Sequence, residues 1–367
     1  MSVYGHGTET AMRNPLDILG NRLLLERLTR DVRENSLSHA YIIDGKTGSG
    51  RHTLALHLAM ALSCRQRPNR KPADSGQMGF FDDLPPEPLD PHAPFPCGVC
   101  EGCRKVLEGI CPDIRIIGRE GKATLGVDAV RRIREDIYLS PGDIDTKIYI
   151  IEDAETMTLQ AQNALLLTLE EPPSYVLFLL LCDGADHLLE TIRSRAPVLH
   201  TAPLTNEELR FCLSKHKRSL PAEELETVLL CADGCAGQAL SLSDPKALRS
   251  LMKLRSLVDA FIEGCANRGS GGVSSAIQQF GSKRDEVMGI LNLISLALRD
   301  LMLLKKSETA VLKYYTQREN ALELSAVFTA KALLSLYQAL EQAQEDLMRN
   351  ANVRLTLTQA CFSAGIM

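Results

Sequence analysis

The sequence contains a glycine-rich segment, GKTGSGRHT, at residues 45–53. Its spacing resembles that of a phosphate-binding loop, G-x-x-x-x-G-K-[ST], whose backbone N–H groups surround phosphates while its lysine reaches the β- and γ-phosphates and its hydroxyl holds Mg²⁺. Arg51 and His52 stand where the lysine and the hydroxyl residue should be. The glycines are present, as Gly45, Gly48 and Gly50. Two interpretations stay open, a turn kept only for packing or nucleotide binding through the backbone donors, and neither predicts hydrolysis.

A pair of acids, Glu152 and Asp153, follows the apolar segment KIYII. The end of such a strand is where a phosphate-loop hydrolase carries its magnesium-binding Asp and the carboxylate that positions water. The usual order is Asp then Glu, and here it is reversed. Because side chains alternate between the two faces of a strand, the reversal changes which carboxylate would face the metal. With two independent departures, the candidate site is predicted to be poor for catalysis.

Three cysteines form two successive C-x-x-C steps in PCGVCEGC, namely Cys97, Cys100 and Cys103. Three thiols in one turn cannot all pair with one another, but they can bind one Zn²⁺ if a fourth ligand is added. Cys64 and Cys111 are both available as that ligand. A redox pair or three unrelated thiols are the alternatives, but the third cysteine in a chain without a secretion signal favours zinc. Four thiolates leave no open coordination position, so we expect a structural site.

Composition narrows the class of protein. The 367 residues are 45% hydrophobic and 24% charged, which is typical of a globular chain with two or three domains. A formal charge of -5 provides no global basic field, so nucleic acid would be contacted through a local patch or through partners. No apolar run reaches the roughly 18 residues of a membrane span, and the first residues have no signal-sequence pattern. We expect a cytoplasmic protein that binds no membrane.

The elements that must position these residues alternate between helix-like and strand-like segments over residues 15–205. Apolar strand-like runs such as AYIID, KIYIIED and YVLFLLLC lie between segments with helical spacing. Continuous apolar strands between helices predict a parallel sheet covered on both faces, which is an α/β nucleotide-binding layout. Residues 1–14 are predicted to be a flexible tail and the proline-rich residues 65–96 a flexible insertion in this domain.

Strand signals stop after residue 205. Short helices are predicted over residues 206–267, and NRGSGGVSS, at 267–275, has the composition of a linker. The remainder, 268–367, is predicted to be helical throughout, with apolar faces wide enough for a bundle or an assembly surface.

Four strings in order now identify a resemblance: LSHAYIIDGKTGSG, IIEDAETMTLQAQNALLLTLEEPP, IRSRAPVL and NANVRLTL. Together they resemble the delta-prime family of subunits of the bacterial DNA polymerase III clamp loader, which are AAA+ proteins. The resemblance implies an AAA+ base domain over 15–205, a helical lid over 206–267 and a helical collar over 268–367. Such subunits commonly lack the ATPase apparatus of the motor subunits, which fits the altered phosphate loop.

The resemblance also implies roles for particular residues. The family's Ser-Arg-Cys motif, whose arginine reaches the ATP of a neighbouring motor subunit, stands here as Ser194, Arg195 and Ala196. Without the resemblance, Arg195 would be a surface arginine in a solvated cluster. The family's zinc module has its first cysteine at the end of the helix after the phosphate loop, which implies Cys64 as the fourth ligand. Gly237 stands where motor subunits carry a nucleotide-sensing arginine.

The function implied is a non-hydrolysing clamp-loader subunit of the DNA polymerase III holoenzyme, itself neither a polymerase nor an active ATPase. Its implied partners are the motor (gamma/tau) and delta subunits in a five-subunit ring, with the sliding clamp and primed DNA reached through that assembly. Two other classes compete with it. One is a working gamma/tau-like motor ATPase, against which the altered loop counts, and the other is a stand-alone zinc-dependent nucleic-acid binder, against which the acidic charge counts.

Overall fold

The computed structural model describes residues 18–68, 95–267, 270–281, 284–349 and 351–366. The chain forms two compact units, which are Met1–Glu208 with Cys235–Gly237, and Leu209–Gly234 with Gln238–Met367. The predicted tail at 1–14 lies outside the described residues, and so does 69–94, which is most of the predicted insertion.

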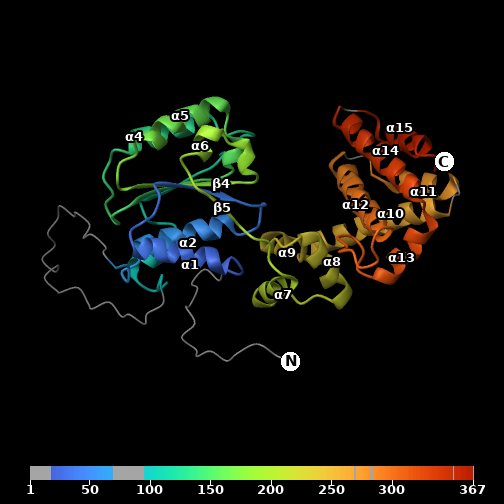
Figure 1. The fold of residues 1–367 in the computed structure, drawn as a ribbon, viewed down its shortest axis with the longest axis horizontal. Coiled ribbons are helices and arrows are strands. Elements are labelled where there is room, and N and C mark those ends of the chain that lie inside the picture. The colour runs from blue at the N-terminus through green and yellow to red at the C-terminus, as the bar shows by residue number, and fades with distance from the viewer. Residues whose placement is uncertain (1–17, 69–94, 268–269, 282–283, 350, 367) are drawn as a thin grey trace, which may run out of the picture. The chain divides into compact units, whose positions relative to one another are not determined.

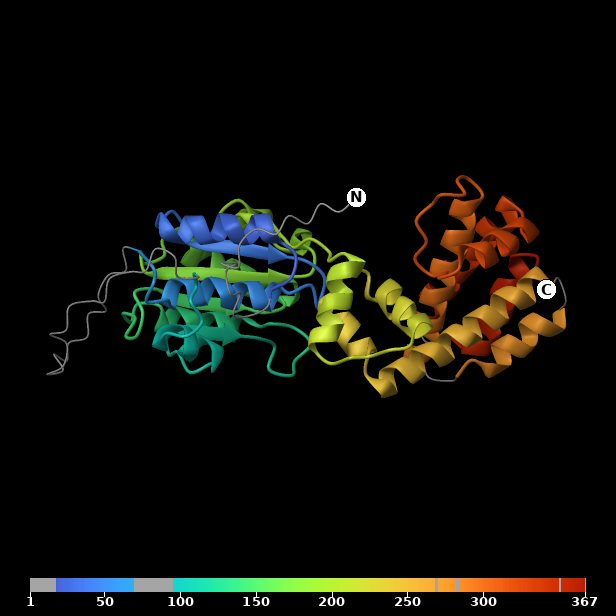
Figure 2. The ribbon, with the colours of Figure 1, turned by 90° about the horizontal axis from the view of Figure 1, so that it is seen from below.

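The first unit is built on a five-stranded parallel sheet with the strand order β2-β3-β4-β1-β5 (Figures 1 and 2). The strands are β1 (Ala40–Asp44), β2 (Ile114–Ile117), β3 (Lys147–Ile151), β4 (Val176–Cys182) and β5 (Val198–His200). The central strands β1, β3 and β4 are buried on nearly every residue, because helices cover both faces. The apolar runs in the sequence therefore predicted the sheet correctly, except for β5, whose three residues are too few to show a pattern.

Alternate residues of each strand pack into the two hydrophobic cores on opposite faces of the sheet. Tyr41, Ile43 and Leu179 pack with α1 (Arg22–Arg33), α2 (Arg51–Ser63) and α3 (Glu101–Leu107) on one face. Ile42 and Phe178 pack on the other face, with α4 (Val127–Asp136), α5 (Leu159–Glu170) and α6 (Glu190–Arg193). Figure 1 shows α1 and α2 on one side of the sheet and α4, α5 and α6 on the other. Two short 3₁₀ helices, η1 (Ala154–Thr156) and η2 (Ala185–His187), follow β3 and β4.

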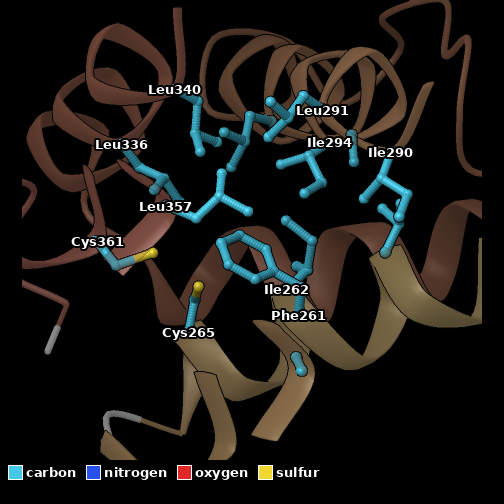
Figure 3. Close-up of a cluster of buried hydrophobic side chains, with 14 of the residues drawn as sticks. Phe261, Ile262, Cys265, Ile290, Leu291, Ile294, Leu336, Leu340, Leu357 and Cys361 are labelled. Atoms are coloured by element: carbon cyan, nitrogen blue, oxygen red, sulfur yellow. The ribbon is translucent and has the colours of Figure 1, made fainter. Parts of the chain in front are cut away.

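The rest of the chain is helical. The helices are α7 (Asn206–Lys215), α8 (Ala222–Ala232), α9 (Ala236–Leu242), α10 (Pro245–Ala266), α11 (Ser270–Gln279), α12 (Arg284–Leu304), α13 (Arg318–Val327), α14 (Ala330–Met348) and α15 (Val353–Ser363). The core of the second unit gathers side chains from α10 to α15, among them Phe261, Ile294, Leu336 and Leu357 (Figure 3). A parallel α/β domain followed by a helical region is thus the architecture that the sequence predicts.

One sequence prediction is wrong. The segment NRGSGGVSS was expected to be a linker, but its residues from Ser270 onward begin α11. A Cβ atom added at Gly272 would lie 3.1 Å from the Cα of Gly264 in α10, and one added at Gly264 would lie 2.9 Å from the carbonyl carbon of Gly272. The glycines are there because two helices approach closely, which a composition of Gly and Ser does not distinguish from a flexible linker.

The segment Glu286–Leu304 of α12 is long and apolar enough to cross a membrane. Half of it is buried within the protein, and Ile290, Ile294 and Leu298 are completely buried in the core of the second unit. A core helix of a folded domain passes the same test of length and composition, and these contacts account for the apolar character of α12.

Candidate functional site

The phosphate loop lies between β1 and α2, at the carboxyl end of the sheet, where α/β proteins bind ligands. Gly48 and Gly50 have φ values of 86° and 92°, which glycine adopts without strain. Gly45 has no room for a side chain, because an added Cβ would lie 1.9 Å from the Oγ1 atom of Thr201. The glycines of the motif are therefore needed by the backbone of this chain, whether or not phosphate binds.

Several polar groups of the loop already have partners within the chain. The N–H of Thr47 donates to the carboxylate of Asp183, at 3.2 Å, and the N–H of Gly45 donates to the carbonyl of Cys182, at 3.1 Å. The N–H of Gly237 donates to the carbonyl of Gly48, at 3.0 Å, and brings the two backbones into contact. A carboxylate on a loop amide is unfavourable for a phosphate at the same place, because the two anions repel each other.

Arg51, at the position of the motif lysine, is only 8% exposed. Its Nη2 atom donates to the hydroxyl of Thr47 at 3.3 Å, and its buried Nη1 atom has no hydrogen-bond partner among the residues that the structure describes. The Arg51 side chain thus lies against the loop, on the residues whose backbone would contact a phosphate. A buried guanidinium N–H without an acceptor is unusual, since such groups are normally satisfied.

Both acids after β3 are paired with basic side chains of the same chain. Glu152 Oε1 lies 3.4 Å from His52 Nε2, so the helix after the loop and the acidic strand end are in contact. Asp153 Oδ2 lies 2.9 Å from both Nε and Nη2 of Arg119. Asp153 has a φ of 50° and immediately precedes η1. Each carboxylate that could hold Mg²⁺ therefore has a basic side chain in contact with it.

Several of these partners were not identified from the sequence. They are Arg119, Asp183, Thr201 and the backbone contact of Gly237. Asp183 offered one signal, because it directly follows a strand whose carboxyl end lies beside that of β1. The contact of Gly237 with Gly48 could not be predicted from local sequence patterns, because the two residues are 189 positions apart.

The four predicted cysteines lie together. Cys64 ends α2, Cys97 and Cys100 precede α3, and Cys103 lies within α3, with all four Sγ atoms within 4.8 Å of one another. The Sγ atoms of Cys97 and Cys103 are 4.0 Å apart. Tetrahedral zinc with Zn–S bonds of about 2.3 Å places its sulfur ligands about 3.8 Å apart, so the group fits a zinc ion.

Backbone and thiol hydrogen bonds support this arrangement. The N–H groups of Cys97, Cys100 and Arg65 donate to the sulfurs of Cys64, Cys97 and Cys100, at 3.3 to 3.4 Å. Hydrogen bonding with Cys103 lowers the pKa of Cys100, whereas hydrogen bonding with Cys100 raises the pKa of Cys64 to about 12. Without a cation the four thiols cannot all ionise, and a divalent metal would remove that conflict.

Cys111, the alternative fourth ligand, is not a member of this group. It is buried beside a cavity of about 110 Å³ that Lys105 and Asp143 also line. Burial raises the pKa of its thiol. Of the two candidates left open by the sequence, the structure therefore brings Cys64 to the cluster.

Ser194 and Arg195 follow α6. The hydroxyl of Ser194 donates to the carbonyl of Thr191, at 3.0 Å. Arg195 is 36% exposed along its side chain, and it contacts Thr191 and Glu170 rather than the phosphate loop of its own chain. Ala196, which replaces the motif cysteine, is completely buried in the core under α5 and α6, so this position serves packing.

The arrangement thus separates three features: a phosphate loop held by internal contacts, a four-cysteine cluster and a surface arginine. Comparison with known families matches residues 20–79 and 87–205 to the family described as DNA polymerase III, delta subunit, and residues 253–363 to the family of its C-terminal part. The two matched regions cover most of the chain.

Among curated proteins, the tau subunit of DNA polymerase III from Bacillus subtilis is 29% identical over 62% of this chain and 37% of its own length. The gamma subunit from Buchnera aphidicola is 28% identical over 62% of this chain and 56% of its own length. The delta' subunit from Escherichia coli is 31% identical over 59% of this chain and 58% of its own length. The chain therefore spans only about a third to three fifths of each of these relatives.

Among solved structures, a gamma-subunit-related protein from Thermotoga maritima is 18% identical with a TM-score of 0.46, over 93% of this chain and 98% of its own. The clamp loader delta protein from Bacillus subtilis is 12% identical with a TM-score of 0.33, over 92% of this chain and 99% of its own. Such scores are too low to bear on the site, and the fold is defined by the sheet itself.

Proposed function

This chain belongs to the clamp-loader family of DNA polymerase III, and we propose that within that family it is a non-hydrolysing subunit of delta-prime type. It would help the assembly load the sliding clamp on primed DNA during replication. The observation that carries this proposal is the internal pairing of the nucleotide site. The Thr47 amide is bonded to Asp183, Glu152 contacts His52, and Asp153 contacts Arg119.

Each of these contacts opposes a step of ATP hydrolysis. Asp183 places a negative charge where phosphate oxygens would bind, and His52 supplies no hydroxyl for Mg²⁺. Arg119 neutralises Asp153 and His52 occupies an oxygen of Glu152, so Mg²⁺ would have to displace both side chains. Close packing of Gly237 on Gly48 leaves no place for the sensing arginine of a motor subunit.

Arg195 is then the residue with a catalytic role, exerted on a neighbouring subunit. Its planar fork suits a γ-phosphate, and arginine fingers raise the rate of phosphoryl transfer by about 10³ to 10⁵ in well-known GTPases. Ser194 precedes it in an exposed turn. The half-exposed position of Arg195 on the surface of the first unit is what such a role requires.

The remaining parts have supporting roles. Cys64, Cys97, Cys100 and Cys103 would hold a structural zinc ion that joins α2 to α3. Residues 15–205 would form the base, 206–267 the lid and 268–367 the collar that assembles the ring with the motor and delta subunits. We place the protein in the cytoplasm, where replication takes place.

A working motor ATPase is the second candidate, and two observations favour it. The tau and gamma relatives are 29% and 28% identical to this chain, close to the 31% of the delta' relative. Within the described part of the chain, the buried Nη1 atom of Arg51 also has no hydrogen-bond partner, which leaves a donor for an anion. Magnesium-dependent ATP turnover by the isolated chain would support this candidate.

The proposed function is tested by ATP turnover of a clamp loader reconstituted with clamp and primed DNA. Arg195→Ala is expected to remove most of the turnover at the site it faces, because no other group replaces the guanidinium. Arg193→Lys is the matched control, since it keeps a cation for the ion pair with Asp186. Equal assembly of the variants is checked first. Unchanged turnover with Arg195→Ala would show that this chain has no arginine finger.

A further inference from the structure

The guanidinium of Arg195 is held by acceptors of its own chain, and one of its contacts is a long hydrogen bond of 3.5 Å from Nη1 to the hydroxyl oxygen of Ser194. Its Nη2 atom lies 3.0 Å from Oε1 of Glu170, and its Nη1 atom donates to the carbonyl of Thr191 at 3.1 Å. Glu170 is the last residue of α5, and Thr191 lies in α6, so the fork is fixed between two helix ends. Both terminal nitrogens of the arginine are therefore engaged.

These are the nitrogens that a phosphate would use. Arginine binds phosphate and carboxylate through two parallel N–H···O bonds, most often from the end of the fork. A carboxylate at 3.0 Å also cancels much of the positive charge that would attract a phosphate. The arginine cannot give its full charge and both terminal nitrogens to a neighbour while it remains paired with Glu170.

The ion pair is placed where it can be exchanged. The side chains of Arg195 and Glu170 are 36% and 48% exposed, so solvent reaches both. Exposed ion pairs are weak and contribute little to folding, and a single carboxylate competes poorly with the several charges of a nucleotide triphosphate. The contact is therefore strong enough to orient an otherwise mobile side chain and weak enough to be replaced.

We propose that Glu170 is a positioning residue for Arg195, which holds the guanidinium against the ends of α5 and α6 until a phosphate on a neighbouring subunit takes the place of the carboxylate. This inference rests on the proposed role of Arg195. It adds that the finger carries its own counter-ion and that occupation of the neighbouring site has to displace that counter-ion.

The test uses the full chain in the reconstituted clamp loader, with ATP as the probe. Glu170→Gln keeps the shape of the side chain and removes its charge. Since the displacement takes place when the neighbour's nucleotide is engaged, the apparent KM for ATP is expected to fall about two- to fivefold, which is the range for an exposed ion pair, with kcat changed by less than about twofold. A role limited to folding would instead lower assembly or kcat.

Glu171→Gln is the matched control. Glu171 is the next residue, is also exposed and forms no ion pair with the described residues, so the KM and kcat of Glu171→Gln are expected to equal those of the wild type. A KM that rises or stays unchanged in Glu170→Gln, or a fall in KM that Glu171→Gln reproduces, would overturn the positioning role.

Two further measurements separate this inference from the proposed function. Unchanged turnover with Arg195→Ala overturns the finger itself, whatever Glu170→Gln does. NMR of the guanidinium group in the isolated chain tests the ion pair without any turnover, and Arg195 is expected to rotate faster in Glu170→Gln than in Glu171→Gln. Equal rotation in the two variants would show that Glu170 does not hold the arginine.

Discussion

At the scale of single residues, the site is defined by which charges are already paired. Glu152 contacts His52 and Asp153 contacts Arg119, so magnesium would have to compete with these side chains for the two carboxylates. Each pair is partly exposed, so neither contributes much to folding, and their effect is on what the site can bind. In the cysteine cluster four thiols meet instead, and their sulfur atoms could hold one metal ion.

Removal of one predicted zinc ligand tests that cluster. Cys100→Ser is expected to lose most of the bound zinc, because three thiolates and a hydroxyl bind it far less tightly. Cys111→Ser is the control, because Cys111 lies outside the cluster. This variant is expected to retain about one zinc per chain. Elemental analysis of the purified variants measures both. Full zinc content in Cys100→Ser would contradict the proposed ligand set.

His57 gives a prediction about pH. It lies in α2 at 7% exposure, and burial lowers its pKa to about 4. Between pH 6.5 and 4 the unfolded chain binds a proton that the folded chain does not, so this residue destabilises the folded state as the pH falls through that window. The loss from pH 7 to pH 5 amounts to about 2 kcal/mol.

Urea denaturation of the first unit at the two pH values measures this effect. His57→Leu is expected to reduce the loss of stability by about 2 kcal/mol, since leucine does not titrate. His216→Leu is the control, because His216 is exposed and lies outside that core. An equal loss of stability in wild type and His57→Leu would show that His57 is not the group responsible.

At the scale of elements, the site is formed by loops at the carboxyl ends of β1, β3 and β4. Parallel pairing brings these ends to one edge, so residues far apart in sequence meet there. The loop after β1 supplies the glycines, the turn after β3 supplies the acids, and the turn after β4 supplies Asp183. Cys235–Gly237 complete this edge through the contact of Gly237 with Gly48.

The contact at Gly237 can be tested with one added carbon. The Cβ of Gly237→Ala would lie 2.9 Å from the Cα of Gly48, and because that neighbour is backbone, one of the two segments must move. We expect faster amide exchange at Thr47 to Gly50 and a loss of about 1 to 3 kcal/mol in the stability of the first unit.

Gly142→Ala is the control for that experiment, because an added Cβ there meets no atom within 4 Å. Its exchange pattern and stability are expected to match those of the wild type. Unchanged exchange in the phosphate loop of Gly237→Ala would mean that this contact does not hold the loop in solution.

At the scale of the whole molecule, each unit has a core of its own. The first unit packs side chains on both faces of its sheet, and the second packs α10 to α15 around Phe261 and Leu336. All four clustered cysteines belong to the first unit, and Cys64 and Cys103 are buried in its core. A metal at that site should therefore stabilise one unit and not the other.

Removal of zinc is expected to act on one unit only. A chelator should lower the unfolding temperature of the first unit markedly, because free energy from metal binding becomes free energy of folding. Calorimetry, with hydrogen exchange to assign each transition, distinguishes the two units. A shift of the second unit's transition, or no shift of either, would contradict the prediction.

Much of this protein was determined by its sequence alone. Local patterns specify the strands of the sheet, the helices around them and the C-X-X-C steps, because each depends on residues close together in the chain. The presence of Arg51 at the position of the motif lysine is visible in the same way. These features required no knowledge of how distant segments meet.

Tertiary structure decided the partners. It placed Cys64 rather than Cys111 in the cluster, Asp183 on the loop amide, Arg119 on Asp153 and Glu170 on Arg195. It also turned part of an expected linker into the start of α11, because Gly264 and Gly272 allow two helices to touch. The physical reason is common to all of these. Charge pairing and close packing depend on distance in space. Sheet order and helix packing fix that distance, and they join residues from 8 to 189 positions apart.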